Sequence, residues 1–212
     1  MLQPMRFIVG LLVLATPLTF WTATPNFIAT PKELMLTLAT IILVGLTTVK
    51  LFKTKQLRLP SFSASLPLIL LILATLGSLF FNPEGRPEAL SSKALTLISL
   101  CVFSLTLIPL ITSDFAKKLV NLIIGSGTLL ALHSLLSLTY LSSSPYLPSY
   151  MQNQSFTPSG SYITTLVLII VSSTLIISRL KSASSKNKYL YFGSLLLSIV
   201  SVVAIVSLML PG

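Results

Sequence analysis

The sequence predicts an all-α protein, a polytopic bundle of about seven transmembrane helices with the N-terminus inside. First, 53% of the 212 residues are hydrophobic and only 8% are charged, whereas a soluble domain is roughly a quarter charged. Second, seven apolar stretches reach the roughly 17–25 residues that a membrane-spanning helix needs. The alternation that is typical of barrel strands is absent. Third, lysine and arginine gather in alternate loops.

The predicted spans are mostly apolar on all sides, as helices in lipid are. To within a few residues, they cover 6–23, 34–52, 65–81, 94–112, 119–141, 161–178 and 190–210. The longest loop, about 142–160, is too short to fold by itself. Residues 1–212 are therefore expected to form a single integral membrane domain.

The first stretch resembles a signal peptide, because Arg6 precedes an apolar run. Cleavage after Ala23, however, would place Trp21 where a small residue is needed. We therefore expect this stretch to be a retained helix.

Small residues in later spans predict close helix packing. Gly127 and Ala131 lie four residues apart in the fifth span. The seventh span carries small residues on one helical face, namely Ser194, Ser198, Ser201 and Ala204. Such residues let helix backbones approach each other in a membrane. Cys101, in the fourth span, is expected to be a small core residue.

The distribution of basic residues predicts the orientation. Eleven fall on one side, namely Arg6, Lys50, Lys53, Lys55, Arg58, Lys117, Lys118, Arg179, Lys181, Lys186 and Lys188. Three fall on the other, namely Lys32, Arg86 and Lys93. Short loops rich in lysine and arginine stay in the cytoplasm. We expect a protein of the cytoplasmic (inner) membrane, with its N-terminus inside and its C-terminus outside.

The composition also limits the classes of function. A net charge of +10 can indicate nucleic-acid binding, but here its distribution is that of a membrane topology, so we expect no nucleic-acid partner. One cysteine, one histidine and four acidic residues leave little material for a disulfide, a metal site or acid–base chemistry. The expected partners are the lipid bilayer and helices of other membrane proteins, with no cofactor and no metal.

His133 is the one ionisable residue well inside a predicted span. An ionisable group within a membrane is a functional candidate by default. A neutral imidazole can act as a base or bind a ligand through a hydrogen bond. The alternative is a structural role, in which His133 bonds a serine or threonine of a neighbouring helix.

Arg86 lies in the most charged outer loop, residues 82–93, between Glu84 and Glu88. A guanidinium group matches the geometry of a phosphate and binds it through two hydrogen bonds. The alternative is a solvated turn, built by two prolines and a glycine, whose charges pair locally.

Three segments combine into a family resemblance. The first reads TPLTFWTATPNFIATPKELMLTL at 16–38, where a Pro-Lys pair leads into the second span. The next, at 74–97, reads ATLGSLFFNPEGRPEALSSKALTL, a helix ending in a Ser-Leu-Phe run before a glycine-containing outer turn. The last, SFTPSGSYITTLVLIIV at 155–171, has a short glycine-containing turn before a span. In this order and topology they resemble the O-antigen ligase/polymerase-like family of bacterial membrane glycosyltransferases.

The resemblance implies a role in cell-surface glycan biosynthesis. Such a protein transfers a glycan from a polyprenyl-pyrophosphate carrier to an acceptor, at the outer face of the cytoplasmic membrane. The pyrophosphate needs cations or hydrogen-bond donors at that interface. The outer side of this chain offers Lys32, Arg86 and Lys93.

The chain also departs from the family pattern. Members usually have more spans and a large outer loop late in the chain, whose arginine and histidine residues handle the donor. No position here matches those residues, so the resemblance assigns no catalytic residue. We expect either the N-terminal portion of a longer protein or a reduced paralogue. A non-catalytic membrane scaffold or assembly subunit, and a small transporter, remain alternative interpretations.

Overall fold

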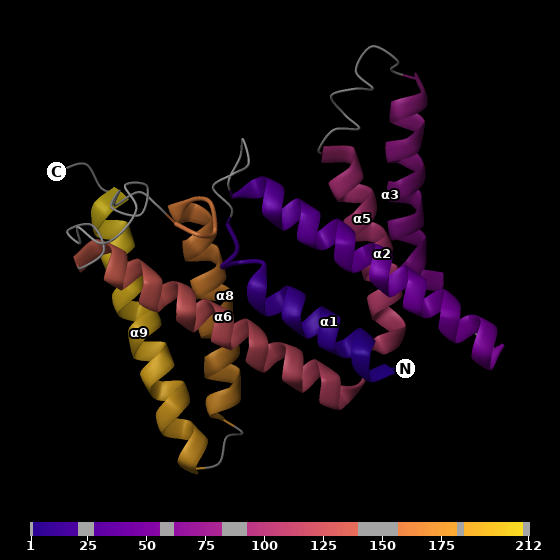
Figure 1. Cartoon of the computed structure of the whole chain (residues 1–212). Coiled ribbons are helices and arrows are strands. Elements are labelled where there is room, and N and C mark those ends of the chain that lie inside the picture. The colour runs from indigo at the N-terminus through magenta and orange to yellow at the C-terminus, as the bar shows by residue number, and fades with distance from the viewer. Residues whose placement is uncertain are drawn as a thin grey trace. The chain divides into compact units, whose positions relative to one another are not determined.

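The computed structural model describes residues 2–20, 28–55, 62–81, 93–139, 157–181 and 185–209 (Figure 1). Every element in these ranges is a helix. The elements are α1 (Leu2–Ala15), α2 (Ala29–Thr54), α3 (Phe62–Phe81), α5 (Lys93–Leu107), the 3-10 turn η1 (Ile108–Leu110), α6 (Ser113–Thr139), α8 (Tyr162–Leu180) and α9 (Ser185–Met209). The predicted all-α fold is therefore confirmed for the described residues.

Among the described residues, five helices are long and apolar enough to cross a membrane, as expected of a multi-pass membrane protein. They are α2, α5 with η1, α6, α8 and α9. The apolar parts of α1 and α3, Gln3–Ala15 and Ser65–Phe81, are shorter. Seven crossings and an inside N-terminus therefore stay predictions.

The first predicted span, residues 6–23, is longer than the helix found there. Helix α1 has 14 residues, about 21 Å at 1.5 Å per residue, against a hydrocarbon core of roughly 30 Å. It ends at Ala15, because Pro17 disfavours helical backbone before it. The Ala15 carbonyl accepts hydrogen bonds from the Leu18 amide at 2.9 Å and from the Thr19 hydroxyl at 2.7 Å. Residues 21–23 lie outside the described ranges.

Three other helices begin five or six residues earlier than the apolar windows predicted. They start at Ala29, Ser113 and Ser185 rather than at 34, 119 and 190. Their first turns carry polar residues, which a hydropathy window leaves out. At the start of α6, the Thr112 hydroxyl accepts a hydrogen bond from the Phe115 amide at 3.4 Å, so Thr112 acts as a helix cap.

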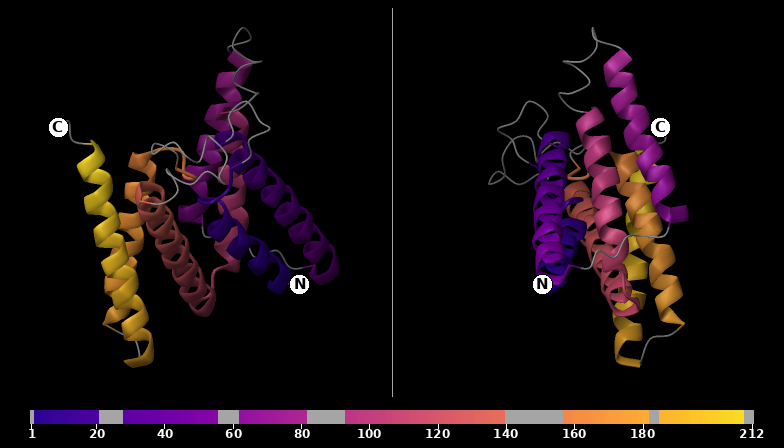
Figure 2. Two further views of the ribbon diagram at one scale, coloured as in Figure 1. Left: turned by 60° about the vertical axis from the view of Figure 1, so that its left-hand side comes forward. Right: turned by 90° about the vertical axis from the view of Figure 1, so that its right-hand side faces the viewer.

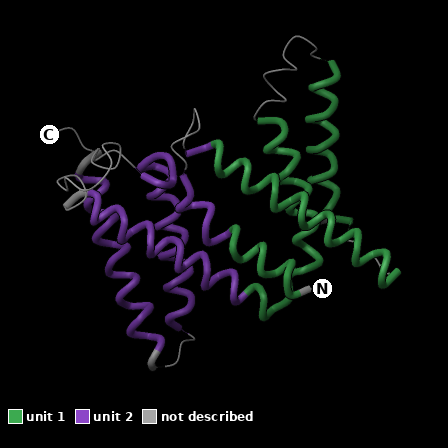
Figure 3. The backbone as a smooth tube through the Cα atoms, viewed as in Figure 1, with its two compact units in different colours: residues 1–12, 30–116 green, residues 13–29, 117–212 purple. Residues whose placement is uncertain are grey.

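The chain divides into two compact units (Figure 3). Unit 1 comprises 1–12 and 30–116, and unit 2 comprises 13–29 and 117–212. The core of unit 1 includes Met5, Val9, Leu43 and Cys101. Cys101 is a free, buried cysteine, as the sequence predicted.

Polar groups join α2 to α5 within unit 1. The Thr40 hydroxyl donates to the Ser99 carbonyl at 3.3 Å, and the Thr37 and Ser99 hydroxyls lie 3.5 Å apart. Helix α3 lies beside α5 (Figures 1 and 2). Its large apolar side chains are nevertheless mostly exposed, with Phe81 at 89%. Such a surface fits lipid contact.

Unit 2 contains a three-helix arrangement of α6, α8 and α9. The Tyr191 hydroxyl bonds the Asn121 side-chain oxygen at 3.4 Å, and the Ser201 hydroxyl donates to the Ala131 carbonyl at 2.9 Å. Both bonds join residues 70 apart, so α6 and α9 run in the same direction. Helix α8 lies alongside α9 (Figure 2) and runs opposite to it, because a short connection joins them.

The predicted small-residue packing is confirmed at Gly127, Ala131 and Ser201. A Cβ atom at Gly127 would overlap the Ser172 side chain. The backbone of α6 therefore lies close against α8 at this position. Ala131 packs with Ile169 and Ile205 in the core of unit 2 and is fully buried. Ser201, fully buried on α9, bonds this same region of α6.

A tight turn leads into α8. The Gly160 amide donates to the Thr157 carbonyl at 3.0 Å. The Ser161 hydroxyl then caps the helix by accepting from the Thr164 amide at 3.1 Å. Gly160 has φ +112°, and a Cβ atom there would lie 3.1 Å from a methyl group of Ile28. The sequence-based expectation of a glycine-containing turn before this span is therefore confirmed.

We expect Gly160→Ala to lower the stability of unit 2 by about 1–2 kcal/mol, because the positive φ strains any residue with a Cβ atom. The matched control is Gly193→Ala on α9, since a Cβ atom there meets nothing within 4 Å. The measurement is the midpoint of unfolding of the detergent-solubilised protein on titration with sodium dodecyl sulfate. Equal midpoints for the two variants would contradict the turn geometry.

Candidate functional site

His133 lies on α6, within unit 2, and is half-buried. Ser134 and Ser137 follow it and are 4% and 3% exposed. The Ser134 hydroxyl donates to the Leu130 carbonyl of its own helix at 2.9 Å. The Ser137 hydroxyl is buried and makes no hydrogen bond within the described residues. The imidazole thus stands at the edge of a group of buried hydroxyls.

The turn before α8 supplies further buried hydroxyls. Thr157 and Ser159 are 3% and 8% exposed, and Thr165 is fully buried. The hydroxyls of Ser159 and Thr165 bond each other, and Thr165 also donates to the Ser161 carbonyl at 3.0 Å. The Thr157 hydroxyl, like that of Ser137, has no hydrogen-bond partner in the described part of the chain.

The register of α6 against α8 places these two groups at one end of unit 2. Gly127 faces Ser172, and the helices run in opposite directions. Continuing that register sets Ser134 opposite Thr165. We call Ser134, Ser137, Thr157, Ser159 and Thr165 the hydroxyl cluster. It is polar but uncharged, so it suits hydrogen bonding to an oxygen-rich group rather than charge pairing.

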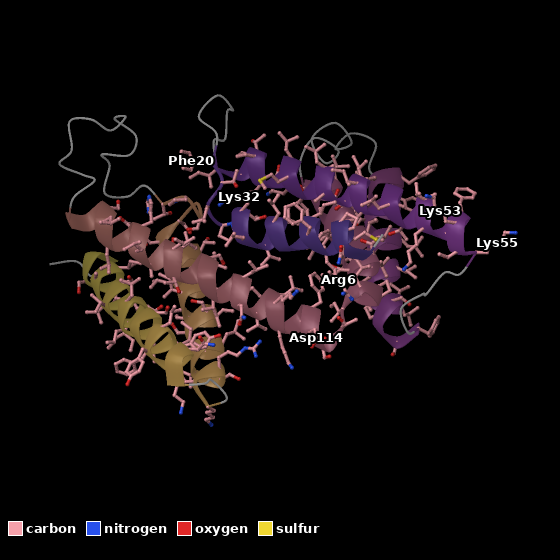
Figure 4. The ribbon with its side chains drawn as sticks, turned by 60° about the horizontal axis from the view of Figure 1, so that its bottom comes forward. Arg6, Phe20, Lys32, Lys53, Lys55 and Asp114 are labelled. Carbon is pink, nitrogen blue, oxygen red and sulfur yellow. The ribbon has the colours of Figure 1, made fainter. Side chains whose placement is uncertain are left out.

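Lys32 lies in unit 1, near the start of α2, and is half-buried. Lys53 and Lys55 lie at the other end of the helix (Figure 4). Arg86, the third candidate from the sequence, lies outside the described residues. The structure therefore does not assemble His133, Lys32 and Arg86 into one described site.

Arg6 has a role that the sequence did not reveal (Figure 4). Its Nη2 donates to the Leu110 carbonyl at 3.4 Å and to the Thr112 hydroxyl at 3.1 Å. Its guanidinium carbon lies 5.4 Å from the centre of the Phe115 ring, within the range of a cation–π contact. One side chain thus joins α1 to the junction between η1 and α6, all within unit 1.

The described residues also set limits on chemistry. Within the ranges that the structure covers, no three His, Cys, Asp or Glu residues gather where they could hold a metal ion. The groups available at the hydroxyl cluster are hydroxyls and, beside them, one imidazole. Such a set can orient a polar ligand, with His133 as the group able to exchange a proton.

These features define the class as an all-helical, multi-pass membrane protein. Comparison with protein-family models, with curated proteins and with solved structures gives no match to this chain. The family resemblance read from the sequence therefore stays a prediction.

Proposed function

We propose that this chain is the membrane portion of an O-antigen ligase/polymerase-like protein, which acts in cell-surface glycan transfer from a polyprenyl-pyrophosphate carrier. Within this chain the role is to bind the donor rather than to complete the catalysis. The observation that carries the proposal is the glycine-containing turn at 157–160 leading into α8. It stands in one of the three segments on which the resemblance rests, and it bears buried hydroxyls.

The donor has a polyprenyl tail, a pyrophosphate and a glycan, and each needs a different surface. The apolar helix faces suit the tail, because it is as hydrophobic as lipid. The hydroxyl cluster and His133 suit the pyrophosphate or the first sugar, because both present many oxygen atoms. The cations that the sequence offers to the pyrophosphate are Lys32 and Arg86, and we assign them this role from the sequence alone, apart from the hydroxyl cluster.

We also propose seven crossings with the N-terminus inside. With seven crossings, eleven basic residues lie on one side of the membrane and three on the other. If α1 and α3 did not cross the membrane, eight basic residues would lie on one side and six on the other. The larger asymmetry is the one that orients membrane proteins. The contact of Arg6 with Thr112 supports this layout, in which both residues lie on the inner side.

The test is binding of a polyprenyl pyrophosphate to the full chain in lipid nanodiscs. We expect it to bind at least about tenfold more tightly than the matching polyprenol. His133→Ala and Arg86→Ala should each weaken it by about tenfold, the effect of losing roughly 1.4 kcal/mol. The control is Leu132→Ala, which removes a partly exposed apolar neighbour of His133 and should leave binding unchanged.

Equal affinity for the pyrophosphate and the polyprenol would contradict donor binding. It would favour the second candidate, a non-catalytic membrane scaffold or assembly subunit. The observation that favours a scaffold is the exposed apolar surface of α3, which another membrane protein could contact. On this helix Phe62, Phe80 and Phe81 are each at least 76% exposed.

A further inference from the structure

The charge of unit 2 is concentrated in two short stretches. Residues 117–212 contain six basic residues and no aspartate or glutamate. The six are Lys117, Lys118, Arg179, Lys181, Lys186 and Lys188. Between and after these stretches, 119–178 and 189–212 contain no lysine, arginine, aspartate or glutamate.

The helices of unit 2 bring the two stretches to one end. Residues 117–118 lie near the start of α6, while α8 ends and α9 begins around 180–185. The ends of α8 and α9 meet at the lower edge of Figure 1. The Arg179 Nη2 donates to the Lys117 carbonyl at 3.0 Å, which fixes the end of α8 against the first turns of α6.

Helix α9 is held to the same end of α6. Tyr191 bonds Asn121, and Asn121 lies one helical turn after Lys117. Since α6 and α9 keep an offset of 70 residues, the same register pairs Lys118 with Lys188. We call Lys117, Lys118, Arg179, Lys181 and Lys188 the basic end. Its four lysines are exposed.

Exposed aromatic side chains accompany the basic end. Tyr189 is 82% exposed and Phe192 is 55% exposed, both within the first turns of α9. Aromatic residues concentrate where a membrane meets water, because their rings suit the headgroup layer. The basic end is therefore placed at the depth of lipid headgroups.

We propose that the basic end binds the phosphate groups of anionic phospholipids in the leaflet that faces it. Five cations gather there, against one carboxylate on the same stretch of α6, that of Asp114, so the remaining compensating negative charge must come from elsewhere. A phosphodiester supplies that charge, and lysine and arginine bind it strongly. Three helices contribute to the surface, so one bound lipid would bridge them. This inference is independent of glycan transfer.

The experiment measures the affinity of phosphatidylglycerol for the purified full chain in nanodiscs of phosphatidylcholine. The test variant is Lys117→Gln/Lys118→Gln/Lys188→Gln. The matched control is Lys50→Gln/Lys53→Gln/Lys55→Gln, which changes two lysines in the last part of α2 and one directly after it. We expect the test variant to weaken phosphatidylglycerol binding by at least about tenfold and the control to weaken it less than about threefold.

Two further arms keep the result interpretable. Replacing the same three lysines of the basic end by arginine should preserve the affinity, which separates lost charge from lost folding. Inorganic phosphate at millimolar concentration should not displace the lipid. Unchanged affinity in the glutamine variant, equal loss in the control, or displacement by free phosphate would each overturn the proposal. His133→Ala, which tests donor binding, should not alter phosphatidylglycerol binding.

Discussion

Gly127→Ala is expected to destabilise unit 2 by about 1–3 kcal/mol, the range for adding a methyl group to a tightly packed contact. The added Cβ atom would overlap both Cβ and Oγ of Ser172. Neither atom is the free end of a long side chain, so α6 and α8 must move apart. The cost exceeds the gain of up to roughly 1 kcal/mol that alanine brings to a helix. The measurement is the unfolding midpoint in detergent with increasing dodecyl sulfate.

Two variants make the result specific. Gly125 lies two residues away on the same helix, and a Cβ atom there meets nothing within 4 Å. Gly125→Ala should therefore be neutral or stabilising. Ser172→Gly removes the side chain that the new methyl group meets, so the double variant Gly127→Ala/Ser172→Gly should recover most of the loss. Failure of that rescue would refute the contact.

Arg6→Ala is expected to release α1 from the junction of η1 and α6. It removes two hydrogen bonds from a charged donor and a cation–π contact, together worth about 2 kcal/mol. Docking is measured by the rate at which a maleimide labels Val9→Cys, because Val9 is fully buried in the native protein. In a Cys101→Ala background, Arg6→Ala should speed labelling by about 30-fold.

Charge and shape can be separated at this position. Arg6→Lys keeps the charge but loses the planar fork, so its labelling rate should fall between those of the native protein and Arg6→Ala. Phe7 is 71% exposed on the next position, and Phe7→Ala should not change the rate. Native-like labelling of Arg6→Ala would show that Arg6 does not hold α1.

The sequence predicted the helices well where apolar residues determine them. The windows 65–81 and 161–178 differ from α3 and α8 by three residues or fewer at each end. It failed where polar or proline residues set the boundary. Pro17 ends α1 inside a predicted span. The first turn of α6 is helical although it carries the charged Asp114. Hydropathy reports burial in lipid, whereas capping and backbone sterics set the ends.

The candidate site was predictable only in part. The position of His133 and the packing role of Gly127 follow from the sequence. The hydroxyl cluster does not, because Ser137 and Thr157 are separated along the chain and share one end of unit 2 only through the register of α6 and α8. The contacts of Arg6 were even harder to predict from the sequence. Its hydrogen-bond partners are 104 and 106 residues away, and one of them is a backbone carbonyl.

That separation has a consequence for biosynthesis. Arg6 of helix α1 is synthesised about a hundred residues before its hydrogen-bond partners Leu110 and Thr112. At the usual 5–20 residues per second, the delay is roughly 5–20 s. During that time the Arg6 guanidinium has neither of these two partners, so water, lipid headgroups or the insertion machinery must bind it. Within unit 1, the contacts of Arg6 therefore form only after the start of α6 has been made.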